Sequence, residues 1–285
     1  MIRIGTCSWK YESWKGIIYP EKERFNFLEE YSKHFNCVEV DQWFWSLFEE
    51  RKVVLPKPSD VKSYSDSVPD DFRFTIKVPN SITLTHFYNK NKSAELKSNP
   101  FFLSNDLFSQ FIESLKPLEK NIGILMFQFE YLNKQKLSGL TEFVDRFEGF
   151  CDKLDKVFSY GIEIRNPNYL KKPFFDFLDR NKISIVFLQG YYMPPVWQVF
   201  KDYKDTLVSP VVIRLHGPDR TGMENKTGNV WNKIVEPKDE ELEKVAEITN
   251  YLSSQKADVY INVNNHFEGC APLTINKLKK LIVKF

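Results

Sequence analysis

Four short segments of the sequence alternate an aliphatic residue with a charged, imidazole or amide residue: 38–41 (VEVD), 162–165 (IEIR), 213–216 (IRLH) and 261–264 (INVN). On a β-strand, successive side chains point to opposite faces, so each segment would place its polar pair on one face. Together these faces supply carboxylates, cations and an imidazole. Such groups can act as general base, general acid and stabilisers of developing negative charge, which suits hydrolysis, elimination or isomerisation.

Long helix-like stretches separate the four segments, which is the spacing of β-α-β units and of a parallel sheet. Strands with one wet, polar face usually belong to antiparallel sheets, whereas parallel sheets are covered on both faces. The polar faces of these strands must therefore line an enclosed space. A closed barrel with a functional mouth meets that requirement.

The order of predicted elements supports a barrel. Strand-like runs lie at about 2–7, 37–41, 72–78, 122–128, 159–165, 183–188, 211–216 and 258–264. Helix-like stretches lie at roughly 22–35, 104–116, 138–155, 172–181, 238–255 and 272–283. Eight such units predict an α/β fold of the (β/α)8 TIM-barrel type, with elaborated loops at the carboxyl ends of the strands. A doubly wound open sheet is the alternative, but no Gly-rich phosphate loop follows the first strand.

No composition break, low-complexity run or repeat divides the sequence, so residues 1–285 are predicted to form a single domain. The connections 79–103 and 189–210 are long, and loops of this length on a rigid scaffold often carry specificity. The segment 215–228 is rich in Gly, Asp, Arg, Asn and Lys, which is typical of a mobile lid.

The active site of such a barrel lies at the carboxyl ends of its strands and in the loops that follow. Reading these ends in order gives candidates from nearly every strand. The candidate catalytic residues are Glu39, Asp41, Glu163 and His216. The candidate substrate-binding residues are Trp9, Lys77, His86, Gln128, Arg165, Arg214 and Asn264.

The charges of these candidates balance. Glu39, Asp41 and Glu163 oppose Lys77, Arg165 and Arg214, so a purely structural network of buried ion pairs is one interpretation. The functional interpretation gives Glu39, Glu163 and Arg214 supporting roles and places the others in contact with substrate. No cofactor is predicted, and a divalent metal is the weaker alternative because three cations crowd the same region. The same cations favour an anionic ligand, since the planar fork of arginine matches phosphate or carboxylate.

The composition is that of an ordinary globular protein. Forty basic and thirty-eight acidic residues leave a net charge of +2, too balanced to imply nucleic acid by itself. The four cysteines show no metal-like spacing and indicate reduced, mostly buried thiols. With no apolar leader and no membrane-length apolar run, the expected location is the cytoplasm. The aromatic residues near the amino terminus, which include Trp9, Tyr11, Trp14 and Tyr19, could form a stacking wall or part of the core.

Several motifs, in order, resemble the YecE-like family known as domain of unknown function 72. They are the segment 5–11 (GTCSWKY) followed by Trp14, Gly16, Tyr19 and Pro20; 38–41 leading to Phe44; Lys77 with Thr85 and His86; 123–128; 163–167 (EIRNP); 214–217 (RLHG); and Asn264 and Asn265 leading to Gly269, Ala271 and Pro272. The resemblance spans nearly the whole chain and implies a TIM barrel, but it assigns no activity. Asp41 stands where the family commonly has asparagine, and Tyr169 where tryptophan often follows the Glu-x-Arg motif.

The leading hypothesis is a metal-independent acid/base enzyme acting on a polar, anionic substrate such as a phosphorylated sugar or a nucleotide-like molecule. Glu163 or Asp41 would be the base, His216 the acid or proton shuttle, and Lys77, Arg165 and Arg214 would hold negative charge. The alternative is a non-catalytic barrel that binds nucleic acid or a partner through a basic, aromatic rim. Its candidates are Lys10, Lys15, Arg220, Lys226 and Trp231. Neither a membrane nor an obligate protein partner is inferred.

Overall fold

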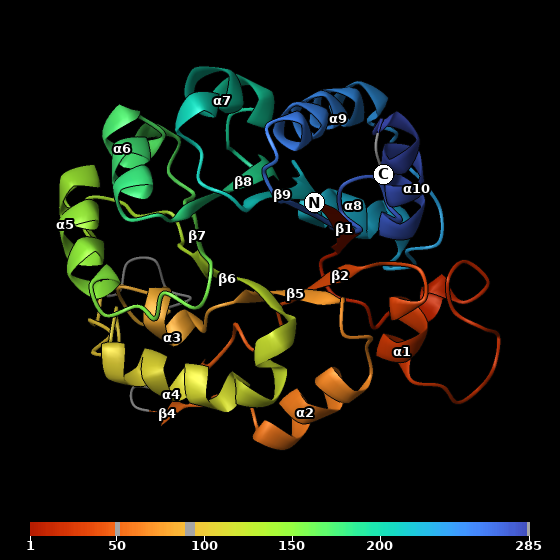
Figure 1. The fold of residues 1–285 in the computed structure, drawn as a ribbon, viewed down its shortest axis with the longest axis horizontal. Helices are drawn as coiled ribbons and strands as arrows, with labels where there is room; N and C mark the ends of the chain where they lie inside the picture. The colour runs from red at the N-terminus through yellow and green to blue at the C-terminus, as the bar shows by residue number, and fades with distance from the viewer. Residues whose placement is uncertain (49–51, 89–94, 284–285) are drawn as a thin grey trace.

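Eight parallel strands form the central sheet of the protein. The structure is a computed structural model that describes residues 1–48, 52–88 and 95–283. The strand order is β1-β10-β9-β8-β7-β6-β5-β2, and all the pairings along it are parallel (Figure 1). The strands are β1 (Ile2–Thr6), β2 (Cys37–Val40), β5 (Arg73–Lys77), β6 (Ile122–Gln128), β7 (Tyr160–Glu163), β8 (Ser184–Gly190), β9 (Val211–Gly217) and β10 (Val259–Val263).

The two ends of this sheet meet, so the sheet curls into a barrel. β1 and β2 meet at their carboxyl ends, where Cys7 pairs with Glu39 in a parallel bridge. The backbone N–H of Ser8 donates to the carbonyl of Glu39 at 3.1 Å, and the N–H of Cys7 donates to Val263 of β10 at 2.9 Å. All eight predicted strands and the TIM-barrel prediction are therefore confirmed. A separate antiparallel pair, β3 (Leu47–Phe48) and β4 (Lys52–Val53), lies outside the barrel sheet.

Helices surround the strands (Figure 1). They are α1 (Phe27–Ser32), α2 (Pro58–Asp66), α3 (Asn80–Thr83), α4 (Asn105–Leu115), α5 (Leu140–Cys151), α6 (Lys172–Arg180), α7 (Val196–Tyr203), α8 (Arg220–Thr227), α9 (Asp239–Ser254) and α10 (Ala271–Leu281). Short 3-10 turns lie at Glu12–Trp14, Lys116–Asn121, Pro167–Tyr169 and Lys204–Thr206. Within the described ranges, no helix is long and apolar enough to cross a membrane.

All six predicted helices occur, but the helix predictions were wrong in two respects. The helix predicted over 22–35 begins only at Phe27, because the Asn26 side chain caps it by accepting from the N–H groups of Leu28 and Glu29. Four short helices, α2, α3, α7 and α8, were not predicted. The expected lid segment contains α8, which Asp219 caps at its start and Gly228 ends in a left-handed conformation.

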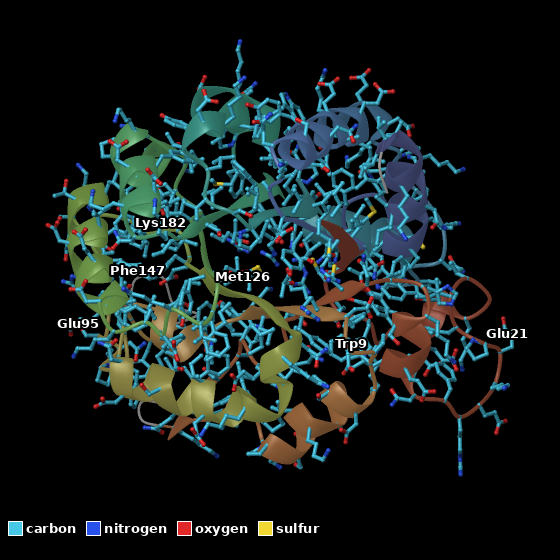
Figure 2. All side chains as sticks on the ribbon, in the orientation of Figure 1. Trp9, Glu21, Glu95, Met126, Phe147 and Lys182 are labelled. Carbon is cyan, nitrogen blue, oxygen red and sulfur yellow. The ribbon has the colours of Figure 1, made fainter. Side chains whose placement is uncertain are left out.

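Apolar packing differs inside and outside the barrel. The lower lumen is filled by an apolar cluster of Cys37, Ile124, Met126, Val186, Val212 and Tyr260. The space between strands and helices holds the larger core, in which Phe147 of α5 packs edge-on to Phe127 of β6 with ring centroids 5.2 Å apart. In Figure 2 Met126 lies among the strands, Phe147 on the inner side of α5, and Glu21 at the periphery. The polar site is thus held above an apolar floor.

Closure of the barrel depends on Gly5. A Cβ atom at this position would lie 1.9 Å from the carbonyl oxygen of Cys37, so β1 and β2 could not approach as they do. Gly5→Ala is expected to lower the free energy of unfolding by at least about 2 kcal/mol, because rigid backbone has to move apart. Urea unfolding measures the loss. Gly149→Ala on α5, where nothing lies within 4 Å of an added Cβ, is the matched control. Equal stability of the two variants would contradict the closure argument.

Candidate functional site

Arg214 lies at the centre of a buried charge network in the upper lumen. Its side chain is 1% exposed. Nε and Nη2 donate to the two carboxylate oxygens of Glu39, each at 2.7 Å. Nη1 donates to Glu163 and, at 3.2 Å, to the side-chain oxygen of Gln128. One arginine from β9 therefore joins carboxylates from β2 and β7 with an amide from β6.

Every acceptor position of the Glu39 carboxylate is occupied. Besides the two bonds from Arg214, Oε1 lies 3.3 Å from Nζ of Lys77, and Oε2 accepts from the amide nitrogen of Asn262 at 3.2 Å. That nitrogen also donates to the Thr75 hydroxyl at 2.9 Å. A carboxylate offers about four lone-pair positions, and here four donors fill them. Glu39 is held in one orientation from β5, β9 and β10.

Glu163 is held in the same way. Its Oε2 accepts from Arg214, and its Oε1 accepts from Nε of Arg165 at 3.0 Å. The Glu163 side chain is 1% exposed, whereas that of Arg165 is 31% exposed. Arg165 therefore extends from the buried network toward solvent at the barrel mouth, and it carries positive charge to that surface.

The cations keep both buried glutamates ionised. Burial alone would raise the pKa of Glu39, but the charges of Arg214 and Lys77 outweigh it and lower the pKa to about 2. Burial likewise opposes ionisation of Glu163, yet Arg214, Arg165 and Lys77 lower its pKa below the ordinary value. Such carboxylates are weak bases, because accepting a proton would neutralise the carboxylate and break its ion pairs with the cations. They are better suited to holding the cations in place than to taking a proton from substrate.

Asp41, at the end of β2, has a different environment. It is half-buried, and no ion pair to it occurs among the residues that the structure describes. Burial raises its pKa from the ordinary value, and Lys77 opposes the rise. Its negative charge in turn contributes to the raised pKa values of Cys7 and Tyr11, in both cases after burial. Asp41 is thus a carboxylate at the mouth whose oxygens are not committed to an arginine.

His216 is buried between a thiol and a phenol. Nε2 lies 3.6 Å from the Cys7 sulfur, and Nδ1 lies 3.4 Å from the Tyr191 hydroxyl. Burial, reinforced by the positive charge of Arg214, holds the pKa of His216 well below its usual value. Burial also raises the pKa of the Cys7 thiol, and Glu39 adds to the rise. At neutral pH the site therefore contains a neutral imidazole and a protonated thiol.

A metal ion is the group most readily considered for such a cluster. Ligand atoms of Cys7, Glu39 and His216 lie within 4.8 Å of one another. However, both oxygens of Glu39 already accept from Arg214, and binding a metal there would break that bidentate pair. The residues therefore fit a divalent ion poorly, and no step of the chemistry is assigned to one.

Two of the predicted loop residues do not join the network. Asn264 accepts from the backbone N–H of His266 at 3.0 Å and contacts its imidazole, so it organises the loop after β10. His86 lies 2.9 Å from the Thr85 hydroxyl. Burial and the charge of Lys136 lower the pKa of His86.

The aromatic residues near the amino terminus belong mainly to the core. Trp9 is 4% exposed, and its ring packs edge-on to Tyr64 with centroids 5.0 Å apart. Its carbonyl accepts from the Tyr19 hydroxyl. Trp14 is completely buried. Of the two interpretations of these aromatics, core packing is the one that the structure favours, and Trp9 is not placed to stack on a ligand.

Tyr191 is a site residue that sequence reasoning missed. It directly follows Gly190, the last residue of β8, and has a φ of +53°, while Gly190 has a φ of +140°. The backbone N–H of Tyr191 donates to the carbonyl of Gly217 at 3.1 Å. A non-glycine residue in the left-handed region is strained, and such strain often occurs at functional sites. Gln189, the polar residue at the end of β8, does not serve the site, because its side chain donates to Glu241 of α9 and accepts from the N–H of Val196. Gly190 was the sequence feature that could have pointed to Tyr191, because a glycine at the end of a strand often marks a sharp turn of the backbone.

Comparisons with known proteins agree on a family. The family model described as "Protein of unknown function DUF72" matches residues 3–284. The protein YecE of Escherichia coli K12 is 30% identical over 173 residues, which are 60% of this chain and 51% of that protein. The chain thus spans about half the length of this relative. YunF of Bacillus subtilis is 24% identical over 95% of this chain and 91% of its own length.

Solved structures show the same fold. A DUF72 family protein from Enterococcus faecalis superposes with a TM-score of 0.70 at 21% identity, covering 99% of this chain and 95% of that one. A DUF72 family protein from Thermotoga maritima gives a TM-score of 0.68 at 20% identity, covering 99% and 98%. These likenesses support the barrel and carry no information about the reaction.

Proposed function

Because this chain belongs to the DUF72 family of proteins of unknown function, which assigns it no reaction, we propose its activity from the site itself. We propose a metal-independent acid/base enzyme, of the hydrolase, lyase or isomerase type, acting on a small anionic substrate such as a phosphorylated sugar or a nucleotide-like molecule. One observation carries the proposal. The buried network holds Glu39 and Glu163 against cations, whereas Asp41 has no ion pair among the described residues and the buried His216 contacts only the neutral Cys7 and Tyr191 side chains there.

The proton-transfer roles follow from this division. Asp41 is the general base, since burial raises its pKa and, among the residues that the structure describes, no arginine is paired with it. His216 relays a proton as a neutral imidazole, because its two ring nitrogens face the Cys7 thiol and the Tyr191 hydroxyl. The geometry favours Asp41 over Glu163 as the base. Glu163 instead fixes the guanidinium of Arg165.

Positive charge at the mouth selects the substrate. The ion-paired network itself holds two carboxylates against Lys77, Arg165 and Arg214, an excess of one positive charge that an ionised Asp41 offsets. Lys77 is 10% exposed on its side chain, and Arg165 is the most accessible of the three cations. An anionic group arriving at the mouth would meet Arg165 first and form charge-assisted hydrogen bonds with it.

The alternative of nucleic-acid binding has less support from the rim. Lys15 pairs with Glu12 at 2.7 Å, Arg220 with Glu224 at 2.8 Å, and Lys226 with Glu236. Trp231, offered as a stacking residue, is only 6% exposed. With three of its four basic candidates paired to acidic residues, the rim provides little of the phosphate attraction that drives such binding. Binding to oligonucleotides at low salt would nevertheless revive this alternative.

The test begins with a screen for turnover of phosphorylated sugars and nucleotides by the full chain. On any substrate found, Arg165→Gln is expected to raise KM about 10- to 100-fold, because charge-assisted hydrogen bonds to the anion are lost. Arg180→Gln, which removes an exposed arginine paired with Glu148 on the outer helices, is the matched control. An unchanged KM for Arg165→Gln in a folded variant would remove this residue from substrate binding.

A further inference from the structure

A cavity of about 760 Å³ opens where β6, β7 and β8 end. Residues from the loops after these three neighbouring strands line it, among them Glu130, Tyr131, Arg165, Tyr191, Tyr192 and Met193. A volume of this size is in the range of sites that hold a small organic ligand. The cavity therefore adjoins the mouth at Arg165 and has room for more than an anionic group.

Three tyrosines give this cavity flat, accessible walls. Tyr192 is 95% exposed and Tyr131 is 59% exposed, although large aromatic side chains usually gain from burial. Tyr191 is fixed by its left-handed backbone and lies under the guanidinium of Arg165, 5.1 Å from ring centroid to Cζ. Aromatic faces left in water beside a cavity are available to stack on a planar ring.

Arg165 supplies the anion-binding end of the same cavity. Only its Nε is bonded, to Glu163, and within the described residues Nη1 and Nη2 make no hydrogen bond to the protein. The pair with Glu163 and the ring of Tyr191 fix the guanidinium plane. Glu130 also lines the cavity, and its Oε2 is paired with Lys136, which offsets its negative charge. The two free Nη groups match two oxygens of a phosphate.

We propose that this cavity is a ring-stacking subsite for the base of a nucleoside monophosphate whose phosphate is held by Arg165. The base lies against Tyr192 and Tyr131, and the phosphate faces the free side of the guanidinium. The Tyr191 hydroxyl, 3.4 Å from His216, joins the subsite to the proton-relay residue. The inference rests on the proposed function for its chemistry, and it narrows the substrate class from anions in general to nucleotides.

Binding measurements on the full chain by isothermal titration calorimetry test the subsite. The probes are AMP, GMP, CMP and UMP, compared with ribose 5-phosphate, adenosine and inorganic phosphate. At least one nucleotide is expected to bind more tightly than ribose 5-phosphate, because only nucleotides can stack. Tyr192→Ala is expected to weaken nucleotide binding by about 5- to 150-fold, the range for loss of one base–aromatic stack, and to leave ribose 5-phosphate unchanged.

Further variants separate stacking from charge. Tyr192→Phe keeps the ring and is expected to retain nucleotide affinity. Arg165→Gln is expected to weaken both nucleotides and ribose 5-phosphate while sparing adenosine. Tyr88→Ala removes a tyrosine that is 75% exposed and does not line the cavity, so it serves as the matched control.

The outcomes distinguish this inference from the proposed function. If no nucleotide binds, or if nucleotides bind no better than ribose 5-phosphate and Tyr192→Ala changes nothing, the stacking subsite is overturned. The acid/base proposal is judged separately, by turnover of Asp41 variants. Ring-dependent binding together with full turnover in Asp41→Asn would keep the subsite and overturn the proposed base.

Discussion

Arg214→Met is expected to lower the free energy of unfolding by about 3–5 kcal/mol, the cost of leaving buried carboxylates without their partner. Arg214 bonds both oxygens of Glu39 and also contacts Glu163, and all three side chains are at most 1% exposed. Methionine fills similar volume but offers no donor. Equilibrium unfolding in urea, with circular dichroism as readout, measures the loss. Arg180→Met, at an exposed ion pair, is expected to change stability by less than about 1 kcal/mol.

A second set of variants keeps this prediction testable if Arg214→Met does not fold. The triple variant Glu39→Gln, Glu163→Gln, Arg214→Met removes both buried negative charges together with the cation. It is expected to recover much of the stability, since the penalty comes from unpaired charge and not from lost volume. If Arg214→Met alone is as stable as the parent protein, water or Lys77 already compensates the charges of Glu39 and Glu163. The ion-pair network would then not be what fixes the geometry of the site.

Asp41→Asn is expected to reduce kcat on a substrate found by screening by about 10²- to 10⁴-fold, the usual contribution of a positioned general base. Asparagine is nearly isosteric but cannot accept the proton. KM is expected to stay the same or fall, because a negative charge near the anion site is removed. Asp41 forms no ion pair with another described residue, so stability is expected to change little. The measurement is steady-state kinetics of both proteins.

The pH profile gives an independent readout of the same residue. The pKa of Asp41 is raised from its ordinary value, chiefly by burial, so the carboxylate becomes protonated at a higher pH than a free aspartate. Activity of the parent protein is expected to fall as the pH drops through that raised pKa, and this acidic limb is expected to be absent from the residual activity of Asp41→Asn. Asp66→Asn on α2, at an exposed pair with Lys62, is the matched control. A full-activity Asp41→Asn variant would return the base role to His216 or Glu163.

Much of the fold could be predicted because strand periodicity is a strong local signal. The runs around Glu39, Glu163 and Arg214 alternate polar and apolar residues, and all of them are lumen-lining strands in the structure. Two of the missed helices, α3 and α8, have weak local signals, whereas α7 buries Val196, Val199 and Phe200 at helical spacing and was overlooked within a long connection. α3 has only four residues, and α8 contains Gly222 in its interior, so neither shows a full amphipathic period.

The candidate site was predicted in location more than in organisation. Glu39, Lys77, Gln128, Glu163 and Arg214 meet in the lumen as their strand positions indicated. His86, Asn264 and Trp9 do not join them. Their loops after the strands set where they lie, and loop conformation depends on contacts with distant segments that the local sequence does not encode.

By itself, the sequence determined which side chains face the lumen, because alternation along a strand requires only the strand's own backbone geometry. It also determined that the positive and negative charges of the candidate site residues nearly balance. Only the tertiary structure decided how the charges pair. Arg214 takes both glutamates because the barrel brings β2, β7 and β9 within reach of one guanidinium. Within the described part of the chain, this leaves Asp41 without an arginine partner and Arg165 open to the cavity. Distances between strands far apart in sequence set those pairings, and therefore which groups remain free for chemistry.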